Sequence, residues 1–188
     1  GIKTYWLKVP YDKPFEPTWY PGKRETHQHI LLVRVMTDEG IEGYGSGEFP
    51  FGLTPTYMTF IQDMIAPWLI GQDPLMIEKL ATRLKGDGRL APRPWIVENA
   101  LWDILGKKAG LPAYKVMGGY RDHIPAYAAM CGLRSDEERQ EDALRLFDEG
   151  FRAVKLRLFM PTIKEDIHIV ENIRKAVGDK MTIICDAN

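Results

Sequence analysis

The chain has 188 residues, 45% of them hydrophobic and 27% charged, which is the composition of a globular protein with a sizeable core. Its net charge of -1 gives no attraction to nucleic acid or to an anionic membrane, so neither is an expected partner and a small molecule is favoured. Two cysteines, Cys131 and Cys185, lack metal or redox spacing and predict reduced core residues of a cytoplasmic protein. No apolar run reaches the roughly 18 residues of a membrane span, and the start lacks the apolar region of a signal peptide.

The first third predicts a small antiparallel sheet, because β-branched and aromatic residues are bounded there by Gly and Asp. Residues 38–40 fit a hairpin turn. The segment 10–26 contains too much Pro and Gly for regular structure, although Trp19 and Tyr20 argue against a purely disordered tether. The expected strands are residues 2–9, 27–38 and 41–49.

The apolar period then becomes helical, and Ile96, Ala100, Ile104 and Leu105 fall near one face. Pro and Gly punctuate this region, so several helices are expected rather than one. The first part of the chain therefore predicts an α+β fold, in which a small sheet is followed by helices. The expected helical segments are residues 54–71, 73–86 and 93–110.

The last third alternates strands with helices, which predicts βαβ units and a parallel sheet. Both helices begin with a capping-box pattern, Ser135 with Glu138 and Thr162 with Glu165. The second helix has an expected apolar stripe, formed by Ile163, Ile167, Val170, Ile173 and Val177. The expected strands are residues 124–132, 151–159 and 181–188, and the helices are residues 135–150 and 162–178.

Two cations stand within an apolar strand, "FRAVKLRLF". Side chains alternate across a strand, so Lys155 and Arg157 share one face. Asp186 and Asn188 share a face at the end of the next strand, where barrel active sites lie. Buried cations require counter-charge, and a carboxylate there suits Mg²⁺. The alternative is that both cations are solvated or paired with a helix carboxylate and that "DAN" is a simple turn.

Three stretches, "WIVENALWDILGKKAGLPAYKVMGG", "GFRAVKLRLF" and "VGDKMTIICDAN", resemble the mandelate racemase and muconate lactonizing enzymes of the enolase superfamily. The likeness extends over essentially the whole chain. It implies an α+β capping domain, residues 1–120, followed by a (β/α)7β TIM-type barrel. Only the first three strands of that barrel, within residues 121–188, are present. A homo-oligomer is also implied.

The resemblance assigns roles to the strand-end residues. In this family the second barrel strand carries K-x-K, and the third ends in a metal-binding Asp. Lys155 matches the first Lys, and Asp186 matches the ligand of Mg²⁺, with two further acidic ligands expected on later strands. The shared reaction removes the proton α to a carboxylate and forms an enediolate. Asn188 is expected to hydrogen-bond a substrate hydroxyl, unless it only forms a turn.

Arg157 departs from the family pattern, because the racemases carry a second Lys there as a base. Arginine keeps its proton at ordinary pH and is a poor general base, although it can donate hydrogen bonds to an oxyanion. One base is enough to eliminate water, and a His on a later strand would supply it. The sequence therefore favours a Mg²⁺-dependent acid-sugar dehydratase. The alternatives are a racemase, epimerase or cycloisomerase of the same superfamily, or a non-catalytic binder of an organic acid.

Substrate choice in this family resides partly in two loops of the capping domain, and by position these loops match residues 14–27 and about 48–55. His123 and His168 are expected to lie outside the site. Trp102 and Asp103 are expected to be structural, the Trp as core and the Asp as a cap or pairing partner. The expected substrate contacts in the first loop are Trp19, Tyr20, Arg24 and His27.

Overall fold

The computed structural model describes residues 1–49, 52–89 and 94–187. The chain forms two compact units, and each is described by itself. The first unit contains Gly1–Pro10 and His27–Asp122, whereas the second contains Tyr11–Thr26 and the residues from His123 onward. Among the described residues, no helix is both long enough and apolar enough to cross a membrane.

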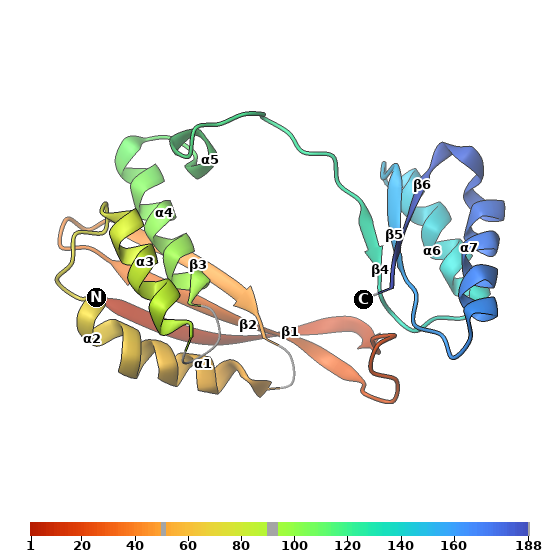
Figure 1. The fold of residues 1–188 in the computed structure, drawn as a ribbon, viewed down its shortest axis with the longest axis horizontal. Helices are drawn as coiled ribbons and strands as arrows, with labels where there is room; N and C mark the ends of the chain where they lie inside the picture. The colour runs from red at the N-terminus through yellow and green to blue at the C-terminus, as the bar shows by residue number, and fades with distance from the viewer. Residues whose placement is uncertain (50–51, 90–93, 188) are drawn as a thin grey trace. The chain divides into compact units, whose positions relative to one another are not determined.

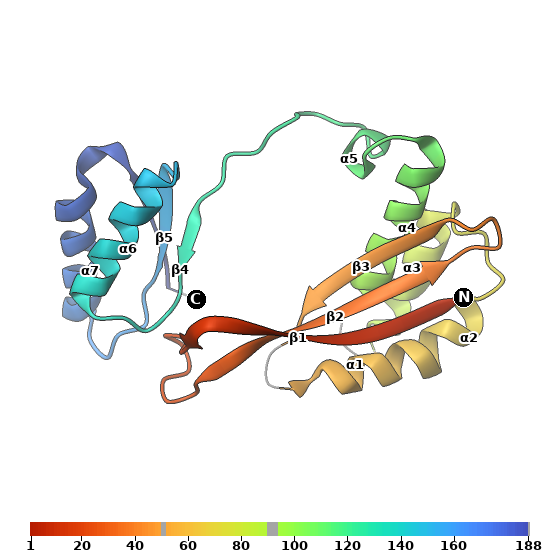
Figure 2. The same ribbon diagram turned by 180° about the vertical axis from the view of Figure 1, so that it is seen from behind.

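The first unit contains a three-stranded sheet in the order β1-β2-β3, and its helices lie on one face of that sheet (Figures 1 and 2). β2 and β3 are antiparallel, with Val33 opposite Gly45. The strands are β1 (Ile2–Phe15), β2 (Glu25–Met36) and β3 (Glu42–Glu48). The helices are α1 (Thr54–Phe60), a π-helical segment (Ile61–Ile65), α2 (Ala66–Leu69), α3 (Ile77–Asp87), α4 (Trp95–Ala109) and α5 (Ala113–Val116).

The prediction that residues 10–26 lack regular structure is wrong at both ends. β1 continues to Phe15, and β2 begins at Glu25. Pro10 and Pro14 are compatible with β1 because it is an edge strand of this sheet, where a missing N–H need not interrupt the hydrogen bonds to a second neighbour. That edge position is not visible in the local sequence. The hairpin turn is as predicted, with Gly40 in the left-handed region at φ 80°.

Glycines at alternate positions of β3 explain how α4 packs on the sheet. A Cβ added to Gly43 would lie 2.0 Å from the carbonyl oxygen of Ala100, and one added to Gly45 would lie 1.9 Å from that of Ile96. The helix backbone therefore rests directly on the strand backbone. The predicted apolar face of α4 is confirmed, since Ile96 and Ala100 are fully buried, Ile104 is almost fully buried, and Leu105 packs against the same core.

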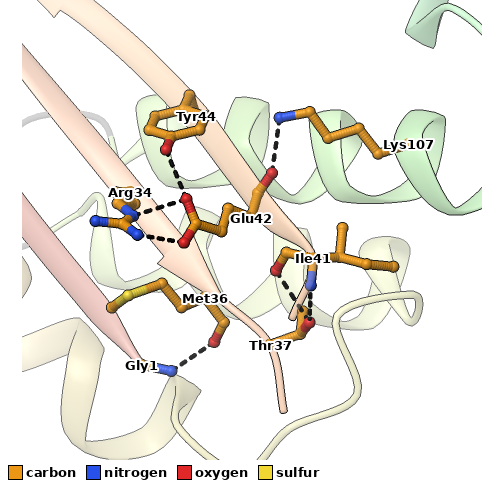
Figure 3. Close-up of polar contacts among 8 residues, drawn as sticks. All are labelled: Gly1, Arg34, Met36, Thr37, Ile41, Glu42, Tyr44 and Lys107. Carbon is orange, nitrogen blue, oxygen red and sulfur yellow. Dashed lines mark hydrogen bonds and ion pairs between the residues drawn. The ribbon is translucent and has the colours of Figure 1, made fainter. Parts of the chain in front are cut away.

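Polar contacts of Asp103 hold α4 to the same strand. Its Oδ2 accepts a hydrogen bond from the backbone N–H of Tyr44 at 2.8 Å and from Lys107 Nζ at 2.7 Å. Lys107 also donates to the carbonyl oxygen of Glu42, whose carboxylate is held by Arg34 and by the Tyr44 hydroxyl (Figure 3). The expected structural role of Asp103 is confirmed. Trp102 is partly buried against the core, as expected.

The second unit contains a parallel sheet in the order β4-β5-β6, which confirms the predicted βαβ units. Its core lies between this sheet and two helices (Figure 1). Val154 and Leu156 of β5 are buried in that core. Both predicted capping boxes are present. The elements are β4 (Ala128–Met130), α6 (Asp136–Asp148), β5 (Ala153–Arg157), α7 (Ile163–Val177), a 3-10 turn (Gly178–Lys180) and β6 (Thr182–Asp186).

The predicted apolar stripe of α7 is correct only in its second half. Ile173 and Val177 are buried together with Ile169, whereas Ile163 and Ile167 are 78% and 52% exposed. Ile167 lies roughly 120° around the helix from Ile173, because each residue turns the helix by roughly 100°. The prediction for the cysteines is also wrong in part. Both thiols are unbridged, but Cys185 is exposed and Cys131 is only partly buried.

Because β3 and α4 are in close contact, we expect a single added methyl group to reduce the stability of the fold strongly. Gly45→Ala should lower the free energy of unfolding by about 1–3 kcal/mol or more, because its Cβ meets a rigid helix carbonyl. Ser46→Ala is the matched control, since Ser46 is exposed on the other face of β3. Urea unfolding of the three proteins measures the difference, and equal midpoints for Gly45→Ala and the unmodified protein would contradict this account.

Candidate active site

Three charged side chains meet on neighbouring strands of the second unit. Arg157 on β5 is the register partner of Asp186 on β6. Arg157 Nη1 donates to Asp186 Oδ2 at 2.7 Å, and Lys155 Nζ lies 3.0 Å from the same oxygen. The two predicted cations and the predicted carboxylate are thus brought together, on the face of β5 opposite the buried Val154 and Leu156.

The cluster is mostly shielded from water, since the side chains of Lys155, Arg157 and Asp186 are 21%, 19% and 25% exposed. The hydrogen bond with Asp186 raises the pKa of Lys155 above its ordinary value, against a smaller opposing effect of desolvation. Lys155 is therefore an ammonium group at neutral pH, able to donate hydrogen bonds and not to accept a proton. One positive charge remains in excess among the three groups, which suits an anionic ligand.

Two aromatic rings flank the cations. Arg157 Cζ lies 5.1 Å from the centroid of the Trp19 ring, and Lys155 Nζ lies 5.6 Å from that of Tyr127. Both distances are within the range of cation–π attraction. Trp19 comes from the segment between β1 and β2, whereas Tyr127 immediately precedes β4.

The segment carrying Trp19 is attached to the chain that follows β4. The backbone N–H of Thr18 donates to the carbonyl oxygen of Cys131 at 3.1 Å, and that of Leu133 donates to the carbonyl oxygen of Glu16 at 2.7 Å. These bonds form an antiparallel bridge between Pro17 and Gly132. Glu16 also accepts a hydrogen bond from the backbone N–H of Gly22. The chain just before Trp19 is thus held by backbone hydrogen bonds, and Arg157 lies over the Trp19 ring.

The other predicted site residues are Arg24, Tyr20, His27 and Asn188. Arg24 pairs with Glu16 at 3.3 Å, and its side chain is 74% exposed. Tyr20 is 54% exposed. His27 is an exposed residue of β2 and belongs to the first unit. Asn188 lies outside the described residues, as does part of the expected second loop at residues 48–55. The roles assigned to these four residues remain predictions.

Sequence reasoning missed Tyr127 and Glu16. Ala129 is the register partner of Lys155, so alternation places Tyr127 on the same face as the cations. That signal requires the register between β4 and β5, which a single sequence does not specify. Glu16 carries no motif at all. His168 contacts Asp136, at 3.1 Å, on the helical side of the sheet, in agreement with its exclusion.

The carboxylate of Asp186 is a type of donor that divalent cations prefer, but by itself it does not form a complete metal site. Carboxylate oxygens are the preferred ligands of Mg²⁺ in proteins. In the described ranges, no group of three or more His, Cys, Asp or Glu side chains is placed to hold a metal ion. The described chain therefore supplies one carboxylate of the type that binds Mg²⁺ at this position, and a complete metal site needs further ligands.

Comparison with known proteins agrees with this arrangement along the chain. The model of the mandelate racemase / muconate lactonizing enzyme N-terminal domain matches residues 10–118. The chain belongs to the mandelate racemase / muconate lactonizing enzyme family. Residues 138–188 match the enolase C-terminal domain-like model. The two family models together thus cover most of the sequence.

Individual members of this family carry different activities. N-succinyl-L-Arg/Lys racemase of Bacillus cereus is 28% identical over the whole chain, and arabinonate dehydratase of Saccharolobus solfataricus is 30% identical over 89% of it. The chain spans 51% and 47% of these two proteins. A racemase from Streptomyces coelicolor with bound magnesium superposes with a TM-score of 0.88 and 26% identity, over the whole chain and 54% of its own length.

The ion pair between Lys155 and Asp186 predicts a change in titration. Asp186→Asn removes the charge that holds the ammonium proton, so the pKa of Lys155 should fall toward its ordinary value. In the unmodified protein the raised pKa means that the pair stabilises the fold at neutral pH and that this contribution is lost only as the pH rises through the alkaline range. NMR titration of ¹³C-labelled lysine in metal-free protein measures the shift. Asp179→Asn, an exposed change, should leave Lys155 unaffected, and an unchanged Lys155 in Asp186→Asn would refute the assignment.

Proposed function

We propose that the protein containing this chain is a Mg²⁺-dependent acid-sugar dehydratase that abstracts the proton α to a carboxylate. The observation that supports this proposal is the presence of Arg157 and its contacts. Its guanidinium is bound to Asp186 and faces Trp19, in the position where the resemblance places a lysine base. An arginine so placed stabilises negative charge and does not take up a proton. This arrangement favours a reaction that needs one base.

Lys155 and Arg157 are the groups of this chain that act on the substrate. Their ammonium and guanidinium groups would bind the substrate carboxylate and donate hydrogen bonds to its oxygens as negative charge develops there. Bound Mg²⁺, with Asp186 as one of its ligands, would act as a Lewis acid on the same oxygens. The cations and the carboxylate stand on neighbouring, hydrogen-bonded strands, which would limit the reorganisation needed when the charge develops.

The proposed elimination of water requires only one base. A base, by the resemblance a His on a later barrel strand, takes the α-proton, and the C–H electron pair forms the enediolate. The enediolate electrons then form the Cα–Cβ double bond, and the β-hydroxyl leaves as water after it receives a proton. The resulting enol tautomerises to a 2-keto-3-deoxy acid. Racemisation instead requires a second base on the opposite face of the carbon, which Arg157 would not supply.

A racemase, epimerase or cycloisomerase is the second candidate. The observation that favours it is the likeness to N-succinyl-L-Arg/Lys racemase, which is about as strong as the likeness to arabinonate dehydratase. A non-catalytic binder of organic acids is the third, favoured only by the net positive cluster. In each case we expect a small-molecule carboxylate ligand and a homo-oligomer.

Incubation of the full-length protein with Mg²⁺ and a panel of sugar acids in D₂O tests the proposal. We expect exchange of the α-proton together with formation of a 2-keto-3-deoxy acid, both followed by NMR. Exchange or epimerisation without keto acid would replace the dehydratase by a racemase. Absence of exchange with every acid would favour the binder.

Lys155 should be required for this reaction. Lys155→Met removes the ammonium group beside Asp186, and we expect the rate of α-proton exchange to fall by about 10²–10³, the usual effect of removing one donor to a developing oxyanion. Lys164→Met is the control, because Lys164 is exposed on α7. A Lys155→Met enzyme that exchanges at the unmodified rate would remove Lys155 from the proposed mechanism.

A further inference from the structure

The guanidinium of Arg157 is oriented by few contacts. Its Nη1 donates to Asp186, and its Cζ lies over the Trp19 ring, 5.1 Å from the ring centroid. Its Nε atom is buried and has no hydrogen-bond partner within the described part of the chain. The hydrogen bonds that would fix the plane of the guanidinium are therefore incomplete. Its orientation then depends more on the contact with the Trp19 ring.

Trp19 is well placed to supply that contact. The chain just before it is held by the bonds of Thr18 and Glu16 to the chain after β4, and the centroid of the Phe15 ring lies 6.3 Å from that of the Trp19 ring. The indole is 38% exposed, so one part contacts protein while another remains toward solvent. Removing the ring would let water reach Nε–H, and the guanidinium could then turn to satisfy that donor.

We propose that Trp19 is a positioning residue, which acts on the substrate through Arg157 by holding the guanidinium plane against Asp186. This inference rests on the proposed function, in which Arg157 stabilises developing negative charge. It differs from the sequence-based expectation that Trp19 contacts substrate directly. The chemistry recognised is that of an oxyanion, which requires a donor already oriented when the charge forms.

Arginine side-chain NMR tests the contact itself without any substrate. In full-length protein labelled with ¹⁵N-arginine, the Arg157 Nε–H signal, assigned from its loss in Arg157→Gln, should be shifted upfield by the indole ring and protected from solvent exchange. Trp19→Leu should abolish both effects, whereas Trp19→Phe, which keeps an aromatic face, should preserve part of the shift. Trp95→Leu removes an indole of nearly equal exposure, 39%, and should leave the signal unchanged.

A double-mutant cycle on α-proton exchange then separates positioning from direct contact. Trp19→Leu should slow exchange by about tenfold in the unmodified protein, a value typical of a partly desolvated cation–π contact. In the Arg157→Gln protein the same change should have less than about a twofold effect, because the group to be positioned is gone. Trp19→Phe should restore most of the rate.

The outcomes are distinct from those of the proposed function. An Arg157 signal unaffected by Trp19→Leu, or rate losses that multiply fully in the double variant, would overturn the positioning role. Exchange without keto acid would overturn dehydration and still allow the cycle to be measured. If no acid exchanges, the NMR shift alone decides whether Trp19 holds Arg157.

Discussion

A single carboxylate oxygen, Asp186 Oδ2, holds two cations that the strand pattern places side by side. Lys155 and Arg157 repel each other, and both are largely withdrawn from water. Without the carboxylate, their desolvation would be uncompensated. The parallel register that sets Arg157 opposite Asp186 is therefore an electrostatic requirement as well as a geometric one. The rings of Trp19 and Tyr127 add weaker attraction on the outer side of the same cations.

The same oxygen is the atom that would bind a metal ion in the reaction of this family. A metal ion bound to Asp186 would compete with the two cations for negative charge. An anionic substrate would restore that charge balance, because its carboxylate can accept hydrogen bonds from Lys155 and Arg157. The excess of positive charge in the cluster thus matches a site that is electrically complete only with an anion present.

The cluster could be predicted from the sequence because it depends on local rules. Alternation along one strand places Lys155 and Arg157 together, and the βαβ order places the end of β6 beside them. The capping boxes and the buried face of α4 follow from equally local signals. The family resemblance added the roles of the residues, which alternation alone does not supply.

What could not be predicted depends on contacts distant in the sequence. Pro10 and Pro14 indicate irregular chain unless β1 is known to be an edge strand. Ile163 continues the apolar spacing of α7 but is 78% exposed, and which of these apolar residues are buried depends on how the helix packs on the sheet. The anchoring of Trp19 uses backbone groups of Cys131 and Leu133, and backbone groups leave no trace in side-chain patterns.

The two compact units are not successive segments of the chain, and this has a consequence for modularity. The polypeptide passes between them three times, after Pro10, after Thr26 and after Asp122. The segment from His123 onward, cut out as one piece, would leave behind the residues that bridge to Gly132 and cover Arg157. Recombination at a single point between Thr26 and His123 would therefore separate the strand-end cations from the Trp19 ring. Exchange of this site between relatives requires two segments to be inherited together.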